Sequence, residues 1–364
     1  MCFTFITACL YVASYRLILR RWEKYGPELF QLRDRNDKSF CLAPTHEELV
    51  TAYVSTQLCS YKQLPVKLYQ IEKKFRDELR PAYGLYRSRE FLMKDLYCFD
   101  RNSESALATY NIIKQTYLYI MKNLGLVSEF VPAKPDLMGE TTSHELVTEF
   151  HAGRQKLVTC ERCSSTTFFG KEDVCVVCKS KMRMWNGVEV GHLFLLSSSY
   201  VDSFSCHFVD ESGVRQPPIM SCYGLGISRL LAVLADIYSD SEGYRFPLSI
   251  VPYKVAITHY GQKKQDDIAI FENLCISVCN RLLAALPDLV DEVIVDDRHY
   301  MNPSQKIADL RGLGFPVIVA LGREMLRSGQ EAVEVRLRRD RRKIYIPFDA
   351  LDTLVEVVRR EVVV

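Results

Sequence analysis

The chain of 364 residues is long enough for two or three domains with buried cores. Its apolar content of 48% and charged content of 25% are ordinary for a globular protein and exclude a collagen-like or low-complexity chain. A net charge of +2 supplies no strong overall field, so any nucleic-acid surface must come from local patches. The 13 cysteines are an odd number scattered through a large chain, which argues against a disulfide framework and for a reducing interior compartment.

The first 21 residues are strongly apolar and contain no acidic residue. Three arginines lie late in this segment, at Arg16, Arg20 and Arg21. Because the positive charge comes late and Arg16 interrupts the apolar run, the segment fits neither a secretory signal nor a membrane span, and we expect no membrane association. Two interpretations stay open, a mitochondrial presequence and the remnant of a truncated domain.

Residues 22–40 predict two turns, each followed by a short strand. The run Pro-Thr-His-Glu-Glu at 44–48 then leads into a helix with apolar periodicity. Thr45 and Glu48 have the spacing of a capping box, in which two side chains satisfy the first N–H groups of a helix. This structural interpretation is compatible with a functional role for Glu47, since Glu48 can cap while Glu47 points into a site.

Residues 73–99 predict a long hairpin, because apolar residues form fragments of a period-two pattern on both sides of its turn. On the first side they are Ile71, Phe75 and Leu79, and on the second they lie within 91–99. Charged side chains crowd the inner ends of its strands: Arg76, Asp77, Glu78, Arg80, Arg87, Arg89 and Glu90. Guanidinium groups suit phosphate, since they bind its oxygens bidentately and stay charged at any working pH. The alternative is a solvated hairpin whose charges pair with one another.

A stripe of apolar residues with helical period covers residues 103–124 and predicts a helix that packs on the core. The segment that follows includes Ser143, His144 and Glu145. We interpret it as structural, with a lone histidine that packs or bonds locally.

Four cysteines form the pattern C-x2-C-x11-C-x2-C: Cys160, Cys163, Cys175 and Cys178. Two such pairs can place four thiolates tetrahedrally around zinc, and four protein ligands make such a site structural rather than catalytic. The spacing between the pairs is shorter than in a usual zinc ribbon, and free buried cysteines are the alternative.

Residues 187–194 predict a strand, on which His192 either packs in the core or borders a pocket. Residues 221–232 run from a glycine-rich strand into an apolar helix that begins near Ser228 and Arg229. The third glycine of a dinucleotide-binding fingerprint is missing, so this run does not predict a dinucleotide site.

From Lys254 onward strands and helices alternate, which predicts a second, α/β domain with a mixed sheet. Its predicted strands cover 255–258, 292–295 and 315–321, and its predicted helices cover 265–286 and 306–313. A hairpin with five arginines and one lysine between Arg336 and Lys343 follows, and then a last helix. Such a basic strand pair suits RNA phosphates, and a solvated edge strand is the alternative.

The hairpin resembles motif 2 of the class II aminoacyl-tRNA synthetases, which it matches without a gap through Phe75-Arg76-Asp77-Glu78 and Arg87-Ser88-Arg89-Glu90-Phe91. Residues 221–232 resemble motif 3 of the same class, with Ser221 where the family has a glycine. The loop sequence resembles that of the prolyl-tRNA synthetases, in the bacterial-like form found in mitochondria. It covers residues 79–95, LRPAYGLYRSREFLMKD. The sequence contains no match to motif 1.

The resemblance covers roughly residues 22–364 and implies an α+β fold. It implies a catalytic domain with an antiparallel sheet over residues 22–252, which carries the Cys-rich insertion 160–178. Residues 253–364 resemble the anticodon-binding domain of the prolyl, threonyl, histidyl and glycyl enzymes. The segment between motifs 2 and 3 is too short for the editing domain that bacterial relatives commonly carry, so we expect none.

The implied reaction is that of a proline–tRNA ligase. The carboxylate of proline attacks the α-phosphorus of ATP to give prolyl-adenylate and pyrophosphate, and the prolyl group then passes to the terminal ribose of tRNA(Pro). Proline, ATP with Mg²⁺ and tRNA(Pro) are the implied ligands, and the mitochondrial matrix is the implied location. Such chemistry depends on positioning and charge neutralisation more than on acid–base catalysis.

The resemblance also assigns roles to single residues. Arg76 would bind the α-phosphate and the carboxylate of proline, and Arg87 and Arg229 would bind the γ-phosphate end, so Arg76 and Arg229 are the expected catalytic residues. Glu78 would hold the adenine amino group, and Phe91 and Arg229 would sandwich the ring. The further expected contacts are Ser228 for ATP and Thr45, Glu47 and His192 for proline.

The family is homodimeric, and motif 1 supplies much of the dimer interface. Without a motif 1 match we expect a weak dimer or a monomer. Two other functions stay open, a synthetase-like tRNA-binding protein with impaired catalysis and a threonyl-tRNA synthetase. A threonyl site is expected to use zinc ligands within its catalytic pocket, whereas the four cysteines here lie in an insertion between the motifs.

Overall fold

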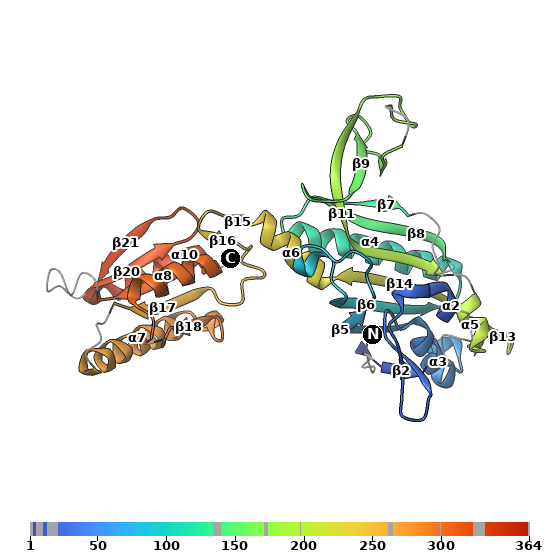
Figure 1. The fold of residues 1–364 in the computed structure, drawn as a ribbon, viewed down its shortest axis with the longest axis horizontal. Helices are drawn as coiled ribbons and strands as arrows, with labels where there is room; N and C mark the ends of the chain where they lie inside the picture. The colour runs from blue at the N-terminus through green and yellow to red at the C-terminus, as the bar shows by residue number, and fades with distance from the viewer. Residues whose placement is uncertain are drawn as a thin grey trace. The chain divides into compact units, whose positions relative to one another are not determined.

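The computed structural model describes residues 3–4, 10–12, 21–133, 140–170, 174–196, 198–260, 265–298, 300–322 and 332–362. The chain divides into two compact units, residues 1–233 and 234–364 (Figure 1). Mixed helices and antiparallel-rich sheets confirm the predicted α+β class. The domain boundary expected after residue 252 lies within the second unit and stays a prediction.

The first unit is built mainly from strands. They are β1 (Phe3–Thr4), β2 (Leu10–Val12), β3 (Gln31–Arg33), β4 (Ser39–Leu42), β5 (Val66–Phe75), β6 (Glu90–Asp100), β7 (Ser128–Pro132), β8 (Glu140–Glu149), β9 (Gln155–Cys160), β10 (Thr166–Phe168), β11 (Met182–Leu196), β12 (Phe208–Val209), β13 (Arg215–Gln216) and β14 (Ile219–Gly226). Its helices are α2 (Arg21–Tyr25), α3 (Glu47–Gln57), α4 (Ser103–Asn123) and α5 (Ser199–Ser203), and α6 (Ile227–Ile237) carries the chain into the second unit.

Nine strands of the described chain form one sheet, with the order β1-β5-β6-β14-β11-β8-β7 and with β9 and β10 beyond the first half of β11. The predicted hairpin is confirmed, since β5 pairs antiparallel with β6 from Val66 opposite Phe99 to Phe75 opposite Glu90. The first strand is shorter than expected. It ends at Phe75, and Leu79 is 84% exposed in the loop beyond it.

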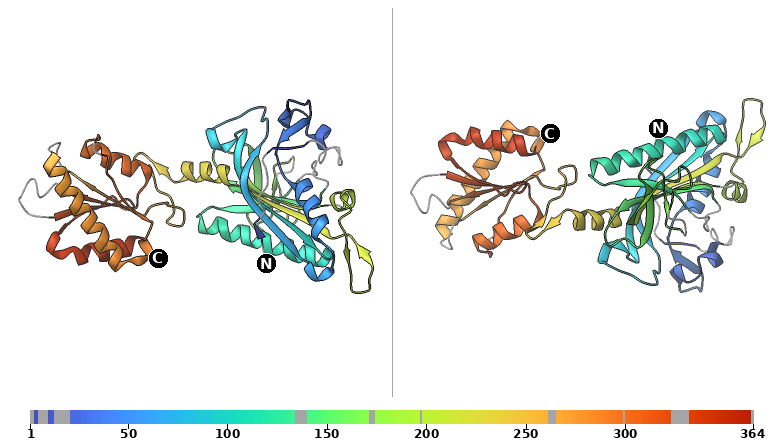
Figure 2. Two further views of the ribbon diagram at one scale, coloured as in Figure 1. Left: turned by 90° about the horizontal axis from the view of Figure 1, so that it is seen from below. Right: turned by 90° about the horizontal axis from the view of Figure 1, so that it is seen from above.

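Helix α4 lies along one face of this sheet (Figure 2) and confirms the helix predicted over 103–124. The side chain of Asn102 caps its first turn, and Gly125 ends it with a left-handed φ of 68°. Two tyrosines of α4, Tyr110 and Tyr117, are buried, with 3% and 2% of their surface exposed. The hydroxyl of Tyr110 donates a hydrogen bond to the backbone oxygen of Leu193 on β11, at 3.5 Å.

The described parts of the N-terminal segment belong to the fold of the first unit. Strand β1 pairs with β5, and β2 pairs with β4 in a small sheet that also contains β3. Helix α2 begins at Arg21, whose side chain is buried. We therefore assign Arg21 to the folded unit and not to the apolar segment 1–21.

The Cys-rich insertion is a hairpin that projects from the rest of the first unit (Figure 1). Strand β9 pairs with residues 182–187, the first half of β11, while the second half of β11 pairs with β14. The pairing of β8 with β11 shifts register twice, between Glu189 and Gly191 and between Leu195 and Leu196. The shift between Glu189 and Gly191 is a β-bulge, which leaves Val190 without a partner on β8.

The second unit is an α/β layer structure around a mixed sheet, as predicted. Its strands are β15 (Ser239–Asp240), β16 (Gly243–Tyr244), β17 (Val255–His259), β18 (Val293–Val295), β19 (Val317–Leu321), β20 (Ala332–Leu337) and β21 (Lys343–Pro347), and its helices are α7 (Gln265–Ala285), α8 (Pro303–Leu313) and α10 (Leu351–Val362). The main sheet has the order β18-β17-β19-β20-β21. Strand β17 is parallel to β18 and β19, because α7 and α8 carry the chain back between them, whereas β20 and β21 are antiparallel.

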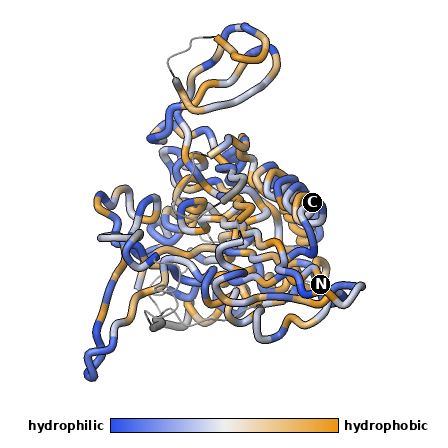
Figure 3. The backbone as a smooth tube through the Cα atoms, turned by 90° about the vertical axis from the view of Figure 1, so that its right-hand side faces the viewer, coloured by the Kyte–Doolittle hydropathy of each residue, from blue (hydrophilic) through white to orange (hydrophobic). Residues whose placement is uncertain are grey.

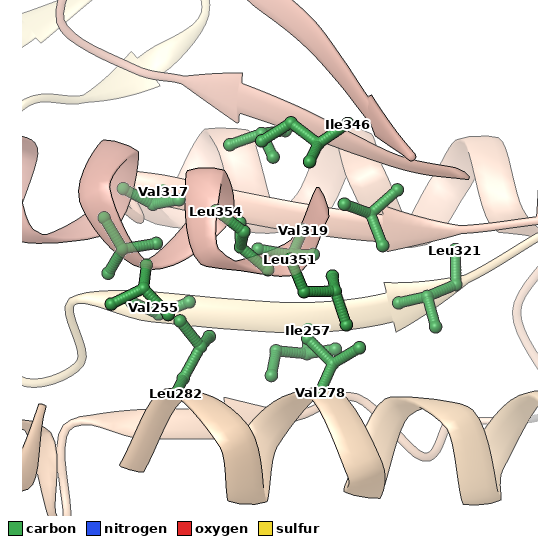
Figure 4. Packing of buried hydrophobic residues seen from close by; sticks show 14 of the residues in the cluster. Val255, Ile257, Val278, Leu282, Val317, Val319, Leu321, Ile346, Leu351 and Leu354 are labelled. Atoms are coloured by element: carbon green, nitrogen blue, oxygen red, sulfur yellow. The ribbon is translucent and has the colours of Figure 1, made fainter. Parts of the chain in front are cut away.

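Figure 4 shows the core of the second unit, where α7 and α10 pack on the central strands. Val255, Val317 and Val319 are fully buried there. Within α7, the window Ile268–Ala285 is apolar enough to cross a membrane by length and composition alone, with a mean hydropathy of 1.5. Since Val278 and its neighbours on one face of α7 pack into the core, this window is weak evidence for a membrane.

Candidate active site

One row of residues crosses five strands on the sheet face opposite α4. By register, the row consists of Gln70, Asp95, Gly224, His192 and Glu145. Because successive residues of a strand alternate between faces, Leu193 and Tyr223 lie on the other face, where Tyr110 of α4 contacts both. Ser221 shares that other face and accepts a hydrogen bond from the Tyr223 hydroxyl at 2.8 Å, so this departure from the family's glycine lies away from the row.

A cavity of about 620 Å³ opens over the row, within the first unit. Its walls include eight of the side chains predicted to bind substrates: Thr45, Glu47, Arg76, Glu78, Arg87, Phe91, His192 and Arg229. Ligand pockets measure about 300–1,000 Å³ as a rule, so the cavity has room for a small-molecule substrate. Segments far apart in the sequence therefore meet in one site.

The loop before α3 brings Thr45 and Glu47 to the cavity. The hydroxyl of Thr45 donates to the carboxylate of Glu47, 2.6 Å from its nearer oxygen. The alternative of a capping box at Thr45 and Glu48 is wrong. The N-cap residue is His46, which makes no side-chain cap, and Glu48 accepts a hydrogen bond from Arg21 at 2.9 Å instead.

Arg76 enters the cavity from the end of β5. Its guanidinium lies over the ring of Phe91, 5.4 Å from the ring centroid, and donates to the backbone oxygen of Pro44 at 3.4 Å. Its Nε is buried without a hydrogen-bond partner among the described residues. Arg76 thus brings to the cavity wall a positive charge that no described carboxylate pairs with, as an anion site requires.

Four other charged residues of the hairpin loop form two ion pairs, as in the alternative left open for this hairpin. Arg87 lies 2.8 Å from Glu78, and Arg89 lies 2.9 Å from Asp77. Partial burial opposes ionisation of Glu78, but the hydrogen bond and charge of Arg87 hold the pKa of Glu78 below its ordinary value. Partly exposed pairs of this kind contribute only about 0–1 kcal/mol, so a phosphate can replace Glu78 at Arg87.

Both ring nitrogens of His192 have partners, which fix the orientation of the ring. Nε2 lies 2.7 Å from the hydroxyl of Ser143, and Nδ1 lies 3.0 Å from the carboxylate of Glu189. The ring also stacks on Phe194, with centroids 3.9 Å apart. Burial opposes ionisation of Glu189, but its hydrogen bond with His192 and the charge of Arg229 hold the pKa of Glu189 below its ordinary value. His192 is therefore a pocket residue and not a core residue.

The two motif 3 residues have different surroundings. Backbone oxygens anchor Arg229, which donates through Nε to Tyr86 at 3.1 Å and through Nη1 to Glu189 at 2.8 Å. Ser228 is not among the residues that line the cavity. Its hydroxyl accepts a hydrogen bond from the Leu92 N–H at 2.8 Å and so joins α6 to β6.

Four acidic residues line the cavity although sequence reasoning did not select them: Glu28, Asp95, Glu145 and Glu189. Asp95 lies 3.1 Å from Lys74, with both side chains buried; burial raises the pKa of Asp95, and the charge of Lys74 opposes this. The period-two pattern of the second hairpin strand could have placed Asp95 on the pocket face. Glu145, expected to be structural, reaches the cavity only through its register with His192, which no sequence pattern indicates.

The four predicted metal ligands lie together at the tip of the projecting hairpin. The sulfur atoms of Cys160, Cys163, Cys175 and Cys178 all lie within 4.8 Å of one another. None of the four lines the cavity, so this group is a separate site.

The basic hairpin of the second unit uses most of its charge within the fold. Arg338 is 7% exposed and holds Asp240 through both Nη atoms, at 2.7 and 3.2 Å. Arg341 also pairs with Asp240, at 3.4 Å. Of the six basic residues of the hairpin, Arg339 and Lys343 form no ion pair with a described residue and are the best placed for RNA phosphates.

Comparisons with known proteins agree with this geometry. The model of the tRNA synthetase class II core domain (G, H, P, S and T) matches residues 30–238. The chain is 38% identical over 315 residues to the probable mitochondrial proline–tRNA ligase of Mus musculus, which covers 84% of this chain and 65% of the relative. The corresponding protein of Schizosaccharomyces pombe is 36% identical over 334 residues, which cover 89% of this chain and 76% of the relative.

A bacterial relative is similarly close. The proline–tRNA ligase of Ehrlichia canis is 33% identical over 348 residues, which cover 90% of this chain and 78% of the relative. The chain spans slightly less than two thirds of the length of the mouse relative.

The fold has a counterpart among solved structures. The prolyl-tRNA synthetase of Cryptosporidium parvum, complexed with halofuginone and AMPPNP, matches with a TM-score of 0.74 over 99% of this chain and 66% of that chain. The sequence identity is 17%, so this match shows a shared fold. Because the core-domain model covers more than half of the chain and the relatives named proline–tRNA ligase are 33–38% identical to it, the chain belongs to the prolyl-tRNA synthetase family of the class II aminoacyl-tRNA synthetases.

Proposed function

We propose that this chain is a proline–tRNA ligase, which activates proline with ATP and transfers the prolyl group to tRNA(Pro) in mitochondria. The observation that carries this proposal is that cationic and acidic side chains line one cavity. Arg76 and Arg229 line it together with the Thr45–Glu47 pair. A tRNA-binding protein without catalysis is not favoured, because the cavity retains both expected catalytic arginines.

The phosphate end of the substrate would be held by arginine side chains. Arg76 would bind the α-phosphate and the proline carboxylate, since it lines the cavity and forms no ion pair with a described carboxylate. Arg229 is oriented by two backbone oxygens and would bind the γ-phosphate with Arg87. Fixed cations at these positions neutralise the negative charge that would otherwise repel the attacking carboxylate, and preorganisation makes this effect large.

The adenine would lie beside Glu78 and Phe91. Glu78 is paired with Arg87 here, and the triphosphate would take over Arg87, which releases a carboxylate oxygen for the adenine amino group. Phe91 would stack on one face of the base and Arg229 on the other. Ser228 would support this arrangement through its bond to Leu92.

The amine end would be held by the loop before α3. The ring nitrogen of proline is a secondary ammonium at neutral pH, and a carboxylate with a neighbouring hydroxyl provides the acceptors that it requires. Glu47 and Thr45 form such a pair, 2.6 Å apart. His192, fixed by its bonds to Ser143 and Glu189, would border the prolyl ring.

Mg²⁺ would enter with ATP, bound mainly to phosphate oxygens. The cysteine group is the one cluster of three or more ligand atoms of the metal-binding type in the described part of the chain, and the cavity carboxylates are dispersed along its walls. A site of this kind fits a cation that arrives with a nucleotide, because Mg²⁺ is usually bound through one or two carboxylates and substrate phosphates.

The proposals for tRNA binding and for location are based on the similarity to the relatives. We propose that the second unit binds the anticodon arm of tRNA(Pro), with Arg339 and Lys343 as phosphate contacts. The mitochondrial location follows the names of the mouse and fission yeast relatives. The oligomeric state, expected from sequence to be a weak dimer or a monomer, stays a prediction, which sedimentation velocity of the purified chain tests directly.

The decisive experiment is ATP–pyrophosphate exchange with proline and, as the matched comparison, with threonine. We expect exchange with proline alone, followed by charging of tRNA(Pro). Exchange with threonine alone would assign the chain to the other synthetase. Binding of tRNA(Pro) without exchange would support the impaired, RNA-binding alternative.

A further inference from the structure

The tip of the projecting hairpin lacks an apolar core. Among the described residues from 161 to 184, Cys175 is the one buried side chain. Val176 and Val177 are 65% and 70% exposed there, and Figure 3 shows apolar stretches along this projecting segment. A segment that buries so little apolar surface needs another source of stability, such as a metal ion or a covalent cross-link.

The two Cys-x2-Cys loops at this tip have the same backbone hydrogen bonds. In the first loop the N–H of Ser164 bonds to the oxygen of Cys160 at 3.0 Å, and in the second the N–H of Lys179 bonds to the oxygen of Cys175 at 2.8 Å. Ser164 and Lys179 also share a left-handed φ, 56° and 58°. Two unrelated stretches of sequence therefore adopt one tight turn, each presenting a cysteine pair.

The first turn directs two backbone N–H groups toward sulfur. The backbone N–H groups of Arg162 and Cys163 both point to the sulfur of Cys160, each at 3.4 Å. Such bonds stabilise a thiolate more than a thiol, because the acceptor then carries a negative charge.

The four sulfur atoms have the spacing of ligands around one metal ion. Those of Cys160 and Cys178 are 3.3 Å apart, those of Cys163 and Cys175 are 3.6 Å apart, and all four lie within 4.8 Å of one another. Zinc binds sulfur at about 2.3 Å, so the ligands of a tetrahedral site are about 3.8 Å apart. We propose that these four cysteines bind one zinc ion, in a structural site distinct from the cavity.

The position of the site explains what the ion would stabilise. Cys160 ends β9 and lies opposite Met182, the first residue of β11, so the metal would close the open end of this two-stranded ladder. The same strand β11 continues to the cavity, where it carries Glu189 and His192. Zinc would thereby protect the tip from unfolding and proteolysis, with little effect on proline binding.

The first test is the metal content of the full chain, purified without added metal and measured by mass spectrometry. We expect about one zinc per chain, and loss of this zinc in Cys175→Ser. Cys59→Ser is the matched control, since Cys59 is an exposed cysteine outside the group, and it should retain zinc. Loss of zinc from the control, or iron in place of zinc, would overturn the proposal.

A second measurement does not depend on the folding of a variant. Exchange of the bound metal for Co²⁺ in the unaltered chain should give the visible bands of tetrahedral cobalt and intense thiolate-to-metal charge transfer. Chelation should abolish these bands and make residues 161–184 sensitive to protease. Two disulfides, detected as the absence of titratable thiols in this group, would instead show a covalent cross-link and overturn the proposal. These readouts do not use catalytic activity, so failure of the proposed enzyme function would leave them unchanged.

Discussion

The guanidinium of Arg21 lies 3.2 Å from the carboxylate of Glu47, with both side chains buried. The same guanidinium group lies 2.9 Å from Glu48, so one cation serves two carboxylates. Only Glu47 of the two lines the cavity. Arg21 therefore holds the proposed ammonium-binding carboxylate in place by a buried ion pair, and its second ion pair, with Glu48, joins it to the first turn of α3.

This relationship predicts different outcomes for two isosteric substitutions. Glu47→Gln should weaken proline binding by about 1.5–3 kcal/mol, roughly 10- to 150-fold in KM, because a charge-assisted hydrogen bond is lost. Glu48→Gln should leave KM for proline nearly unchanged and reduce the free energy of unfolding by about 1–3 kcal/mol. Exchange kinetics and urea unfolding of both variants are the measurements. Equal KM values for the two variants would contradict the assignment of Glu47 to the amine.

Arg76→Ala should abolish adenylate formation while the fold stays intact. Loss of a charge-assisted contact made in the transition state costs a few kcal/mol, or several hundred-fold in rate. Arg89→Ala is the matched control, because Arg89 pairs with Asp77 outside the cavity wall. Pyrophosphate exchange and circular dichroism of both variants test this prediction, which a nearly normal rate for Arg76→Ala would contradict.

Two glycines of the sheet should respond oppositely to a methyl group. A Cβ at Gly224 would lie 3.4 Å from Asp95, an ordinary contact, but it would occupy the cavity floor, so Gly224→Ala should keep its stability and lose activity. A Cβ at Gly187 would lie 2.5 Å from Val147 and 2.6 Å from Leu157, so Gly187→Ala should lose about 1–3 kcal/mol of stability through overpacking.

Thermal unfolding and exchange kinetics of these two variants separate the effects. Gly187→Ala should retain nearly normal activity per folded molecule, because Gly187 is not part of the cavity wall. A large loss of stability in Gly224→Ala would mean that the cavity floor has no room for a methyl group.

The acidic loop of the second unit should make its stability depend on pH. The hydrogen bond from Arg338 holds the pKa of Asp240 far below its ordinary value, and the bond from Arg311 lowers the pKa of Glu242. A lowered pKa in the folded state means stability that is fully present above the ordinary pKa of about 4 and is lost as the pH falls further. Arg338→Met should therefore lower Tm at pH 7, and its deficit should shrink below about pH 4.

Arg339→Met is the control for this prediction, since Arg339 is exposed and forms no ion pair with a described residue. Its Tm should follow that of the unaltered chain at every pH. A deficit of Arg338→Met that is constant down to pH 2 would show that lost packing, and not the ion pair, causes it.

Elements with strong local patterns were predictable from sequence. The apolar stripe of α4, with Asn102 before it and Gly125 after it, specifies a helix and both of its ends. The hairpin β5–β6 and the order of strands and helices in the second unit follow from similar local patterns.

Contacts that depend on tertiary structure were not predictable in this way. Alternation along a strand tells which residues share a face, but the row from Gln70 to Glu145 also requires the register of five strands. Composition alone places Arg21 in an apolar, acid-free segment, and no local pattern reveals its partners, which follow about 26 residues later. The sequence left the basic hairpin open to RNA phosphates or to solvent, because no local pattern reveals that Asp240 lies beside Arg338.

Because of the bulge at Val190, the geometry of the site depends on the number of residues in β11. In a regular strand, residues three apart point to opposite faces, yet Glu189 and His192 are in contact. Val190 is the extra residue of the bulge, and this extra residue brings Glu189 and His192 to one face of the sheet. Deletion of Val190 would turn one of the two toward α4 and disconnect them, whereas Val190→Ala would keep the parity and the contact. In this strand a change in length would therefore do more harm to the pocket than a change in side chain.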